Sequence, residues 1–234
     1  MPVTLEAPAK PERLLRETES YWDGFYSQHN LRHTPSPFAL WCLQHHLRPD
    51  SRVLELGCGN GRDSFTFLHH GLPVLAVDGS AEAIADNAAH LSVTGTEAEG
   101  HFVALNFAKL DRLKRREAAH LVMVNTVYTR FVLHAVPEPL EDRLLDFCAA
   151  ILPAGGRMLH EFRTLRDPLM QQGEVLSANE RMTSHYRRFI DPNALRAKLA
   201  ARGFTEIYFV ESDGLAVFGD EDPVVARIVA EKGA

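Results

Sequence analysis

The chain has 234 residues, of which 45% are hydrophobic and 24% charged, with 15 glycines and 13 prolines. These proportions exclude a disordered or collagen-like protein, and the length favours one large α/β domain. The formal net charge of −6 argues against nucleic acid or an anionic membrane as a partner. No apolar run is long enough to span a bilayer, no secretory signal is visible, and the three cysteines lack the spacing of a disulfide framework or zinc site. We therefore expect a cytoplasmic protein without a metal centre.

Residues 1–50 are predicted to form an N-terminal arm and a helical lid. A helical pattern runs from Pro11 to His29 and ends in an aromatic cluster that includes Tyr21, Trp22 and Tyr26. A second helix is expected to begin at the prolines that flank Ser36, because proline favours the first turn of a helix.

From residue 51 onward, short apolar segments alternate with helical windows. The predicted strands are Arg52–Leu56, Pro73–Val77, His101–Leu105, His120–Val124, Arg157–Phe162, Thr205–Val210 and Gly214–Phe218. The predicted helices are Gly61–His70, Ser80–His90, Ala108–Glu117, Pro137–Ile151 and Asp191–Arg202. Alternation of this kind predicts an α/β fold, a doubly wound, mostly parallel seven-stranded sheet. Only three residues separate the last two strands, so these are expected to form an antiparallel hairpin.

Two regions stand apart from this alternation. Residues 163–190 are too long for an ordinary connection and are expected to form a functional insertion, because they follow the carboxyl end of a parallel strand. The basic run Arg112–Arg116 is expected to lie on the solvated face of a helix.

The most specific motif is a glycine loop between the first strand and the helix that follows it, where residues 55–63 read ELGCGNGRD. Glycine permits positive φ angles and lets a ligand approach the backbone, and a helix N-terminus binds anions. The spacing is G-x-G-x-G, whereas a dinucleotide fingerprint needs a glycine where Arg62 stands. Asp78 ends the next strand, 19 residues beyond Gly59, where a carboxylate can accept both hydroxyls of a ribose.

The glycine loop and Asp78 together resemble the class I S-adenosylmethionine-dependent methyltransferase family of small-molecule type, over roughly Arg52 to Phe162. The resemblance implies a Rossmann-like methyltransferase fold and S-adenosyl-L-methionine as cofactor. It places the methionine carboxylate near the glycines, the ammonium near Glu55 and the adenine near Asn106 and Phe107. The expected cofactor contacts are Tyr21, Trp22, Tyr26, Glu55, Gly57, Cys58, Gly59, Asn60, Gly61, Asp63, Asp78, Gly79, Ser80, Asn106, Phe107 and Asn125.

The acceptor pocket is expected to lie beyond the fourth and fifth strands. His134, in a Leu-His pair that is frequent in the family, and Glu161 are the candidate general bases; the alternative for His134 is a role in orienting its loop. The expected substrate contacts are Tyr128, Arg130, Arg163, Tyr186, Arg187 and Arg188. The arginines favour an anionic substrate, although Arg187 and Arg188 could instead pair with surface acids.

The sequence therefore predicts methyl transfer to a small-molecule acceptor, such as a metabolite, a glycan or a secondary-metabolite intermediate. The alternatives are an NAD-dependent oxidoreductase and a non-catalytic module that binds S-adenosylmethionine. The acceptor atom is left open between oxygen, nitrogen, sulfur and carbon. The protein is expected to act as a monomer or a homodimer.

Overall fold

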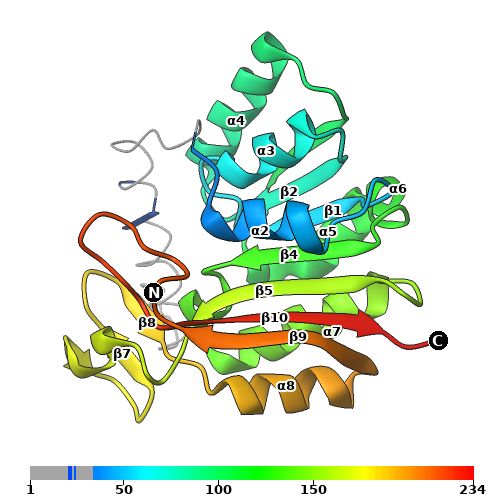
Figure 1. Ribbon diagram of the computed structural model, residues 1–234. Helices are drawn as coiled ribbons and strands as arrows, with labels where there is room; N and C mark the ends of the chain where they lie inside the picture. The colour runs from blue at the N-terminus through cyan, green and yellow to red at the C-terminus, as the bar shows by residue number, and fades with distance from the viewer. Residues whose placement is uncertain (1–20, 23, 25–33) are drawn as a thin grey trace, which may run out of the picture.

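The computed structural model describes residues 21, 22, 24 and 34–234, and its centre is a seven-stranded sheet of order β3-β2-β1-β4-β5-β10-β9 (Figure 1). The strands are β1 (Val53–Leu56), β2 (Val74–Asp78), β3 (Gly100–Ala104), β4 (Thr126–Arg130), β5 (Arg157–Arg163), β9 (Phe204–Ser212) and β10 (Val225–Lys232). Strands β1, β2, β3, β4 and β5 are parallel to one another, and β10 runs antiparallel to both β5 and β9. The predicted doubly wound sheet with an antiparallel last strand is confirmed.

Helices cover both faces of this sheet. They are α2 (Pro37–His45), α3 (Arg62–His69), α4 (Ala81–Thr94), α5 (Leu110–Arg116), α6 (Ala118–Leu121), α7 (Glu138–Ile151) and α8 (Pro192–Ala201). Successive side chains of a strand point to opposite faces, so Val127 packs in the core cluster of α7 and α8, and Tyr128 packs in the cluster of α2 and α3. Figure 1 accordingly shows α2 and α7 on opposite sides of the sheet.

The predicted strand His120–Val124 is wrong. Residues 118–121 form α6 and β4 begins only at Thr126. The apolar run is amphipathic over one turn: Leu121 and Val124 are buried, whereas Val122 is 78% and Met123 51% exposed. Burial at a spacing of three residues belongs to a helical turn and not to a strand buried on both faces.

The predicted last strand, Gly214–Phe218, is also wrong. Residues 213–224 form a loop, and the antiparallel strand is β10, in which every residue from Val225 to Ala230 is buried. Strand β10 lies between β5 and β9, so Val225 pairs with Arg163 on one side and with Ser212 on the other. The connection between β9 and β10 is therefore a long loop and not a tight hairpin.

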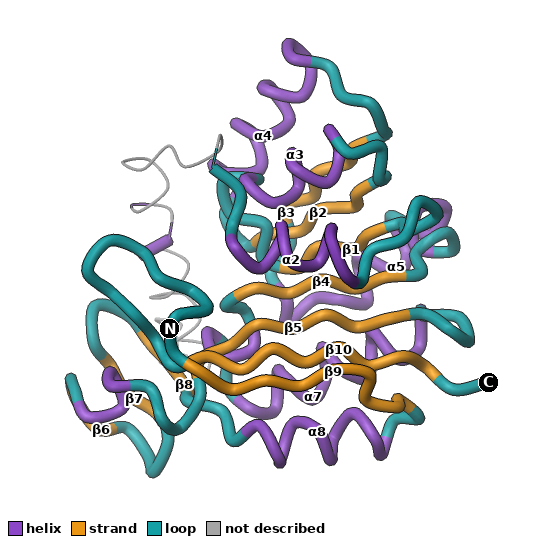
Figure 2. Tube along the Cα trace, viewed as in Figure 1, coloured by secondary structure: helices purple, strands orange, loops and turns teal. Residues whose placement is uncertain are grey.

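The insertion predicted at 163–190 forms a small three-stranded antiparallel sheet of β6 (Glu174–Val175), β7 (Glu180–Met182) and β8 (Tyr186–Arg188). Figure 2 shows it beside the loop between β9 and β10, at the end of the molecule where β4 and β5 terminate. Two separate segments of chain thus extend past the carboxyl edge of the parallel strands.

The second predicted helix is present as α2. Ser36 caps it, since its Oγ accepts a hydrogen bond from the backbone N–H of Ala39 at 3.0 Å. The expected helix Pro11–His29 and the expected cofactor contact Tyr26 lie outside the described residues, apart from Tyr21, Trp22 and Gly24. The part of the chain that is described contains no helix long and apolar enough to cross a membrane.

The cysteines are buried and form no disulfide. Burial raises the pKa of the Cys42 and Cys58 thiols well above their ordinary value, and raises that of Cys148 to about 12. Thiols in this state are protonated and unreactive at neutral pH.

The basic run on α5 is a solvated face, as expected. Arg112, Lys114, Arg115 and Arg116 are exposed, and the intervening Leu113 is fully buried.

Candidate active site

A cavity of about 340 Å³ opens at the carboxyl ends of the parallel strands. The loops after β1, β2 and β3 form one half of its wall. The segment after β4, the insertion and the loop between β9 and β10 form the other half, and Tyr21 and Trp22 also line it. Open α/β sheets bind their ligands at this edge.

The glycine loop contributes Gly57 and Asn60 to the first half of the wall, beside the side chains of Glu55 and Asp78. Gly57, Gly59 and Gly61 all have positive φ, at 77°, 51° and 76°. A Cβ atom on Gly57 would lie 2.1 Å from Cγ2 of Val132, so the glycine loop packs directly against the segment after β4. Gly61 caps α3, the helix whose N-terminal N–H groups begin at the cavity. The glycine loop that the sequence predicted is thus present between β1 and α3.

Asp78 lies on the cavity wall at the end of β2. Its Oδ2 accepts a hydrogen bond from the N–H of Gly59 and its Oδ1 accepts one from the N–H of Ser80, each at 2.8 Å. These two bonds fix the carboxylate between the glycine loop and the start of α4, and each carboxylate oxygen can accept further hydrogen bonds. Asn106 and Phe107 line the same wall beyond β3, where adenine is expected.

Glu55 and Asp63 also line this half but differ in environment. Burial raises the pKa of Glu55 to about 8, aided by the charge of Asp63, and Ser64 donates a hydrogen bond to it. Asp63 accepts hydrogen bonds from Ser36 N at 2.8 Å, Ser36 Oγ at 2.7 Å and Tyr128 Oη at 2.8 Å. Asp63 therefore joins α2, α3 and β4, whereas Glu55 is a buried carboxyl suited to a cationic ligand.

Arg62 is a pocket residue that the sequence did not identify, since it was considered only as a break in the dinucleotide motif. Its Nε is buried without a hydrogen-bond partner, and the nearest carboxylate oxygen, Oδ1 of Asp63, is 3.8 Å away. A buried donor that lacks an acceptor is costly unless a ligand supplies one. Arg62 thus presents a buried cationic donor at the cavity wall, which suits an anionic ligand.

His134 follows β4 and faces the second half of the cavity. Its Nδ1 accepts a hydrogen bond from the backbone N–H of Arg163 at 3.1 Å. Burial, and then the charge of Arg163, lowers the pKa of His134 well below its ordinary value, so the ring is neutral. The single proton of the ring is consequently on Nε2, so in this state His134 presents a hydrogen-bond donor at Nε2, while its Nδ1 is occupied by the N–H of Arg163.

Glu161, the other candidate base, lies outside the cavity. Only 1% exposed, it forms ion pairs with Arg130 at 3.0 Å and with Arg227 at 2.8 Å. This carboxylate does not line the cavity, and its ion pair with Arg130 helps to hold that side chain in place.

Three of the predicted substrate-binding arginines line the cavity. Arg130 pairs with Glu161, and Arg163 pairs with Asp167 at 2.9 Å and Glu221 at 2.5 Å. Arg187 donates a hydrogen bond to the Thr183 hydroxyl but has no acidic partner among the described residues. Of the arginines that line the cavity, Arg187 alone thus forms no ion pair with a described carboxylate, although the more distant charges of Glu221 and Asp167 act on it.

The cavity lining does not include four of the predicted contacts, namely Asn125, Tyr128, Tyr186 and Arg188. Asn125 precedes β4, at the opposite end of the sheet, and bonds to the backbone of Arg52 and Asp50. Tyr128 is buried beneath the cavity against Asp63.

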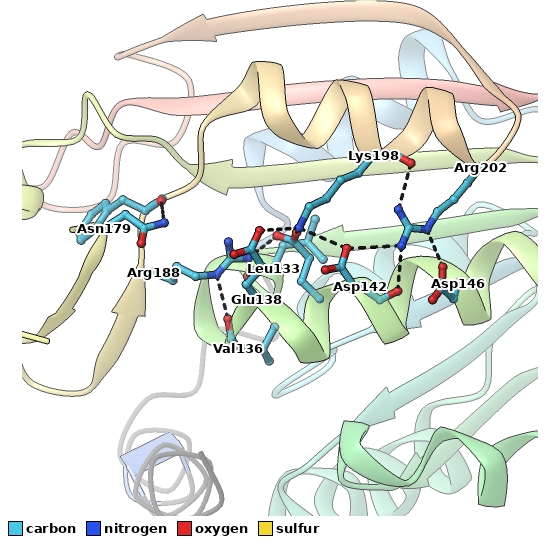
Figure 3. Close-up of polar contacts among 11 residues, drawn as sticks. Leu133, Val136, Glu138, Asp142, Asp146, Asn179, Arg188, Lys198 and Arg202 are labelled. Carbon is cyan, nitrogen blue, oxygen red and sulfur yellow. Dashed lines mark hydrogen bonds and ion pairs between the residues drawn. The ribbon is translucent and has the colours of Figure 1, made fainter. Parts of the chain in front are cut away.

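Tyr186 and Arg188 also point away from the cavity. The hydroxyl of Tyr186 donates to Glu180 at 2.5 Å, and Arg188 donates to Glu141 and to the carbonyls of Leu133 and Val136 (Figure 3). Their expected substrate contacts are therefore absent, because strand alternation turns these side chains to the other face of β8 from Arg187.

The second half of the cavity also contains residues that the sequence did not select. His185 packs against Tyr21, with ring centroids 4.2 Å apart, and against Trp22, at 4.9 Å. Phe131 has φ 61°, the one positive φ outside glycine in the described chain, and the guanidinium of Arg130 lies 4.3 Å from its ring centre. Phe218 and Glu221 reach the cavity from the loop between β9 and β10. No sequence signal marked that loop, because its residues were assigned to a strand.

Comparisons with known proteins agree with this geometry. A family profile described as a methyltransferase domain matches residues 54–158. A ubiquinone biosynthesis O-methyltransferase of Xanthomonas axonopodis pv. citri (strain 306) is 28% identical over 191 residues, covering 78% of this chain and 74% of that protein. The enzyme of the same name from Azoarcus sp. (strain BH72) is 24% identical over 194 residues, covering 80% and 78%.

Solved structures share the fold. A SAM-dependent methyltransferase of Methanosarcina mazei aligns with a TM-score of 0.67 and 16% identity, covering 82% of this chain and 96% of that one. The 1,6-didemethyltoxoflavin-N1-methyltransferase of Burkholderia thailandensis, solved with that substrate and S-adenosylhomocysteine, aligns with a TM-score of 0.64 and 22% identity, covering 98% and 94%.

Fold, glycine loop and comparisons together define a class I S-adenosylmethionine-dependent methyltransferase. The chain carries a match to a methyltransferase domain over residues 54–158, is an enzyme, and uses S-adenosyl-L-methionine as its cofactor. The alternative of an NAD-dependent oxidoreductase is not favoured.

Proposed function

We propose that the enzyme methylates a hydroxyl oxygen of a small aromatic acceptor that carries an anionic group. The observation that carries this proposal is the continuity of one cavity, which joins the glycine loop and Asp78 to Arg187, a guanidinium without an ion pair to a described carboxylate. The similarity to enzymes named as O-methyltransferases supports oxygen as the acceptor atom.

The first half of the cavity is the proposed cofactor site. Arg62 and the N-terminus of α3 would hold the methionine carboxylate, Glu55 the ammonium and Asp78 the ribose hydroxyls. The cofactor supplies an electrophilic methyl group on a sulfonium, whose departure leaves a neutral thioether. The protein therefore contributes mainly by holding the acceptor in line with that methyl group.

The second half is the proposed acceptor site. Trp22, Phe131 and Phe218 line it with flat apolar surfaces, which suit an aromatic ring. Arg187 and the neutral His185 lie at its rim, and burial together with the charges of Arg187 and Arg163 lowers the pKa of His185 to about 3. An acceptor carboxylate or phosphate would bind to Arg187, since guanidinium groups bind such anions with paired hydrogen bonds.

We propose that His134 donates its Nε2–H to the acceptor oxygen. The acceptor hydroxyl would release its proton to solvent water before methyl transfer, and a donor beside it, together with nearby arginine charges, would favour the ionised oxygen by lowering the pKa of the hydroxyl. This role requires no protein base at His134, in agreement with the N–H that Arg163 donates to Nδ1.

We further propose that residues 1–50 serve as an arm and lid, with 51–234 as the catalytic domain. Tyr21 and Trp22 line the cavity and pack on His185 from the insertion, which supports this division. The lid would exclude water from the methyl group during transfer.

The decisive experiment compares aromatic acids with their neutral counterparts, for example 3,4-dihydroxybenzoate with catechol, as acceptors of radiolabelled methyl. We expect the wild type to prefer the acids, and Arg187→Met to lower kcat/KM for the acids by about tenfold to a hundredfold, the effect of one charge-assisted hydrogen bond. Affinity for S-adenosylhomocysteine should be unchanged. Equal rates for acids and neutral compounds in the wild type would contradict the anionic acceptor.

A further inference from the structure

Two histidines and a glutamate converge far from the cavity. His101 lies on β3, the edge strand of the sheet, and Glu117 and His120 lie at the start and in the middle of the turn of α6. Nε2 of His101 is 2.9 Å from Oε2 of Glu117, and Nδ1 of His120 is 3.4 Å from the same oxygen. None of the three lines the cavity. His101 precedes Asn106 on the cavity wall by five residues, or about 16 Å along an extended chain.

The backbone fixes the relative positions of the three side chains. Glu117 and His120 are three residues apart, so they project from the same face of one helical turn. The carbonyl of Glu117 accepts the N–H of His120 at 3.0 Å and that of Leu121 at 2.8 Å. His101 is held in the ladder opposite Leu75 of β2. Two regular elements therefore hold the cluster, and no flexible loop contributes to it.

The donor spacing suits a single metal ion. Imidazole nitrogens and carboxylate oxygens bind zinc at about 2.0–2.2 Å, so two ligand atoms at angles of 90–110° lie about 3.0–3.5 Å apart. The two measured distances are close to this range, and all the candidate ligand atoms lie within 4.8 Å of one another. The rings of His101 and His120 are stacked at 4.4 Å and 8°, so ligation requires one ring to tilt out of the stack.

The exposure of the two histidines allows an ion to enter, and a neighbouring carboxylate determines which nitrogen of His120 is available as a ligand. The side chains of His101 and His120 are 41% and 37% exposed, whereas Glu117 is nearly buried. Oε1 of Glu99 lies 3.7 Å from Nε2 of His120, the nitrogen turned away from the cluster. A carboxylate in that position favours protonation of Nε2 and leaves Nδ1 as the ligand.

We propose that His101, Glu117 and His120 form a binding site for a divalent transition-metal ion of the zinc and nickel type. Two imidazoles and one carboxylate suit these borderline ions better than magnesium or calcium, which prefer oxygen ligands alone. Water would complete the coordination. The bound ion would link the edge strand β3 to α6 and so stabilise this side of the sheet, without taking part in methyl transfer.

The test uses the full chain after dialysis against a chelator, with Zn²⁺ as the probe. At free Zn²⁺ about 100 times its Kd, we expect the Tm of the wild type to rise by about 5–10 °C. His101→Ala and His120→Ala should lose this rise, and His69→Ala, which removes an exposed histidine on α3, should keep it. Circular dichroism before Zn²⁺ addition shows whether each variant is folded.

Cobalt provides a second readout that does not depend on stability. Co²⁺ should give visible d–d absorption bands with the wild type and with His69→Ala, and not with His120→Ala. If Zn²⁺ raises the Tm of His120→Ala as much as that of the wild type, or if the wild type shows neither a Tm rise nor cobalt bands, the three side chains share only hydrogen bonds and the proposal is wrong. Binding of S-adenosylhomocysteine is unaffected in either case, so the result is independent of the proposed acceptor.

Discussion

Glu55 shows how one buried carboxyl links ligand binding to pH. With a pKa of about 8 it holds its proton at pH 7, and a cationic ligand beside it would favour the ionised form. Binding of S-adenosylmethionine at pH 7 is therefore expected to release up to one proton, which Glu55→Gln should abolish. Calorimetry in buffers of different ionisation heat measures this directly. Equal proton release by both proteins would contradict the role of Glu55.

The same pKa predicts a slope of stability against pH. The folded pKa of Glu55 is raised above its ordinary value of 4.5, so between these values the folded state keeps a proton that the unfolded state has lost. Its contribution is fully present below pH 4.5 and is lost as the pH rises through about 8. In thermal unfolding, Glu55→Gln should accordingly gain in Tm relative to the wild type between pH 5 and pH 8.5.

Substitutions of His134 can distinguish a hydrogen-bond donor from a general base at this position. Glutamine can present an N–H near the position of Nε2, whereas alanine cannot. We expect His134→Gln to retain more activity than His134→Ala, which should lose about tenfold to a hundredfold in kcat/KM, because the bound acceptor is ionised less when its oxygen has no donor beside it. The wild-type rate should show no ionisation of His134 near pH 6.5, since the pKa of this residue is far lower. Equal inactivity of both variants, with a rate that falls below pH 6.5, would instead indicate a base.

At the scale of elements, one buried ion pair attaches the insertion to the catalytic segment. Arg188 of β8 pairs with Glu141 of α7 and donates to the carbonyls of Leu133 and Val136, which flank His134 (Figure 3). Lys198 of α8 lies 2.8 Å from the same glutamate. The position of His134 thus depends on contacts from two elements that follow it in the chain.

Removal of Arg188 should destabilise the protein strongly. Loss of one partner of a buried pair costs about 3–5 kcal/mol, and the lower value applies because Lys198 still partners Glu141. We expect Arg188→Met to lower Tm by about 6–12 °C. The matched control is Arg202→Met, since Arg202 pairs with the exposed Asp142 and Asp146 and such pairs contribute about 0–1 kcal/mol. Similar Tm losses in the two variants would contradict the importance of the buried pair.

The elements also show where sequence reasoning succeeds and where it fails. Strands β1 and β2 could be predicted because each is apolar apart from one acid, Glu55 or Asp78, and is followed by a glycine. The segment His120–Val124 has the same composition, but Val122 and Met123 are exposed, so it could not be distinguished from a strand without its neighbours. Arg187 and Arg188 are adjacent in the sequence, and only the pairing of β8 determines which one faces the cavity.

At the scale of the whole molecule, β10 lies inside the sheet and not at its edge. It pairs with β5 along Val225–Glu231 and with β9 along Val225–Lys232. Its removal would leave both neighbours with unpaired backbone groups and a core without Val225, Ile228 and Val229.

Deletion of residues 224–234 is therefore expected to abolish cooperative folding. Deletion of Gly233 and Ala234 alone removes no residue of β10 and serves as the control. Circular dichroism during heating distinguishes the outcomes, and a sharp transition within a few degrees of the full-length protein after the longer deletion would contradict the placement of β10. The interior position of β10 could not be predicted from the sequence, because a strand that lies between two others has no signature in its own residues.

Complete burial of the native thiols makes it practical to attach a fluorescent label to the loop between β9 and β10. Maleimide dyes react with accessible thiolates, which Cys42, Cys58 and Cys148 do not provide in the folded protein. A cysteine placed at the exposed Val217, in the loop between β9 and β10, would then be labelled selectively without removal of any natural cysteine. Fluorescence from that single position could report how the loop responds when cofactor and acceptor bind.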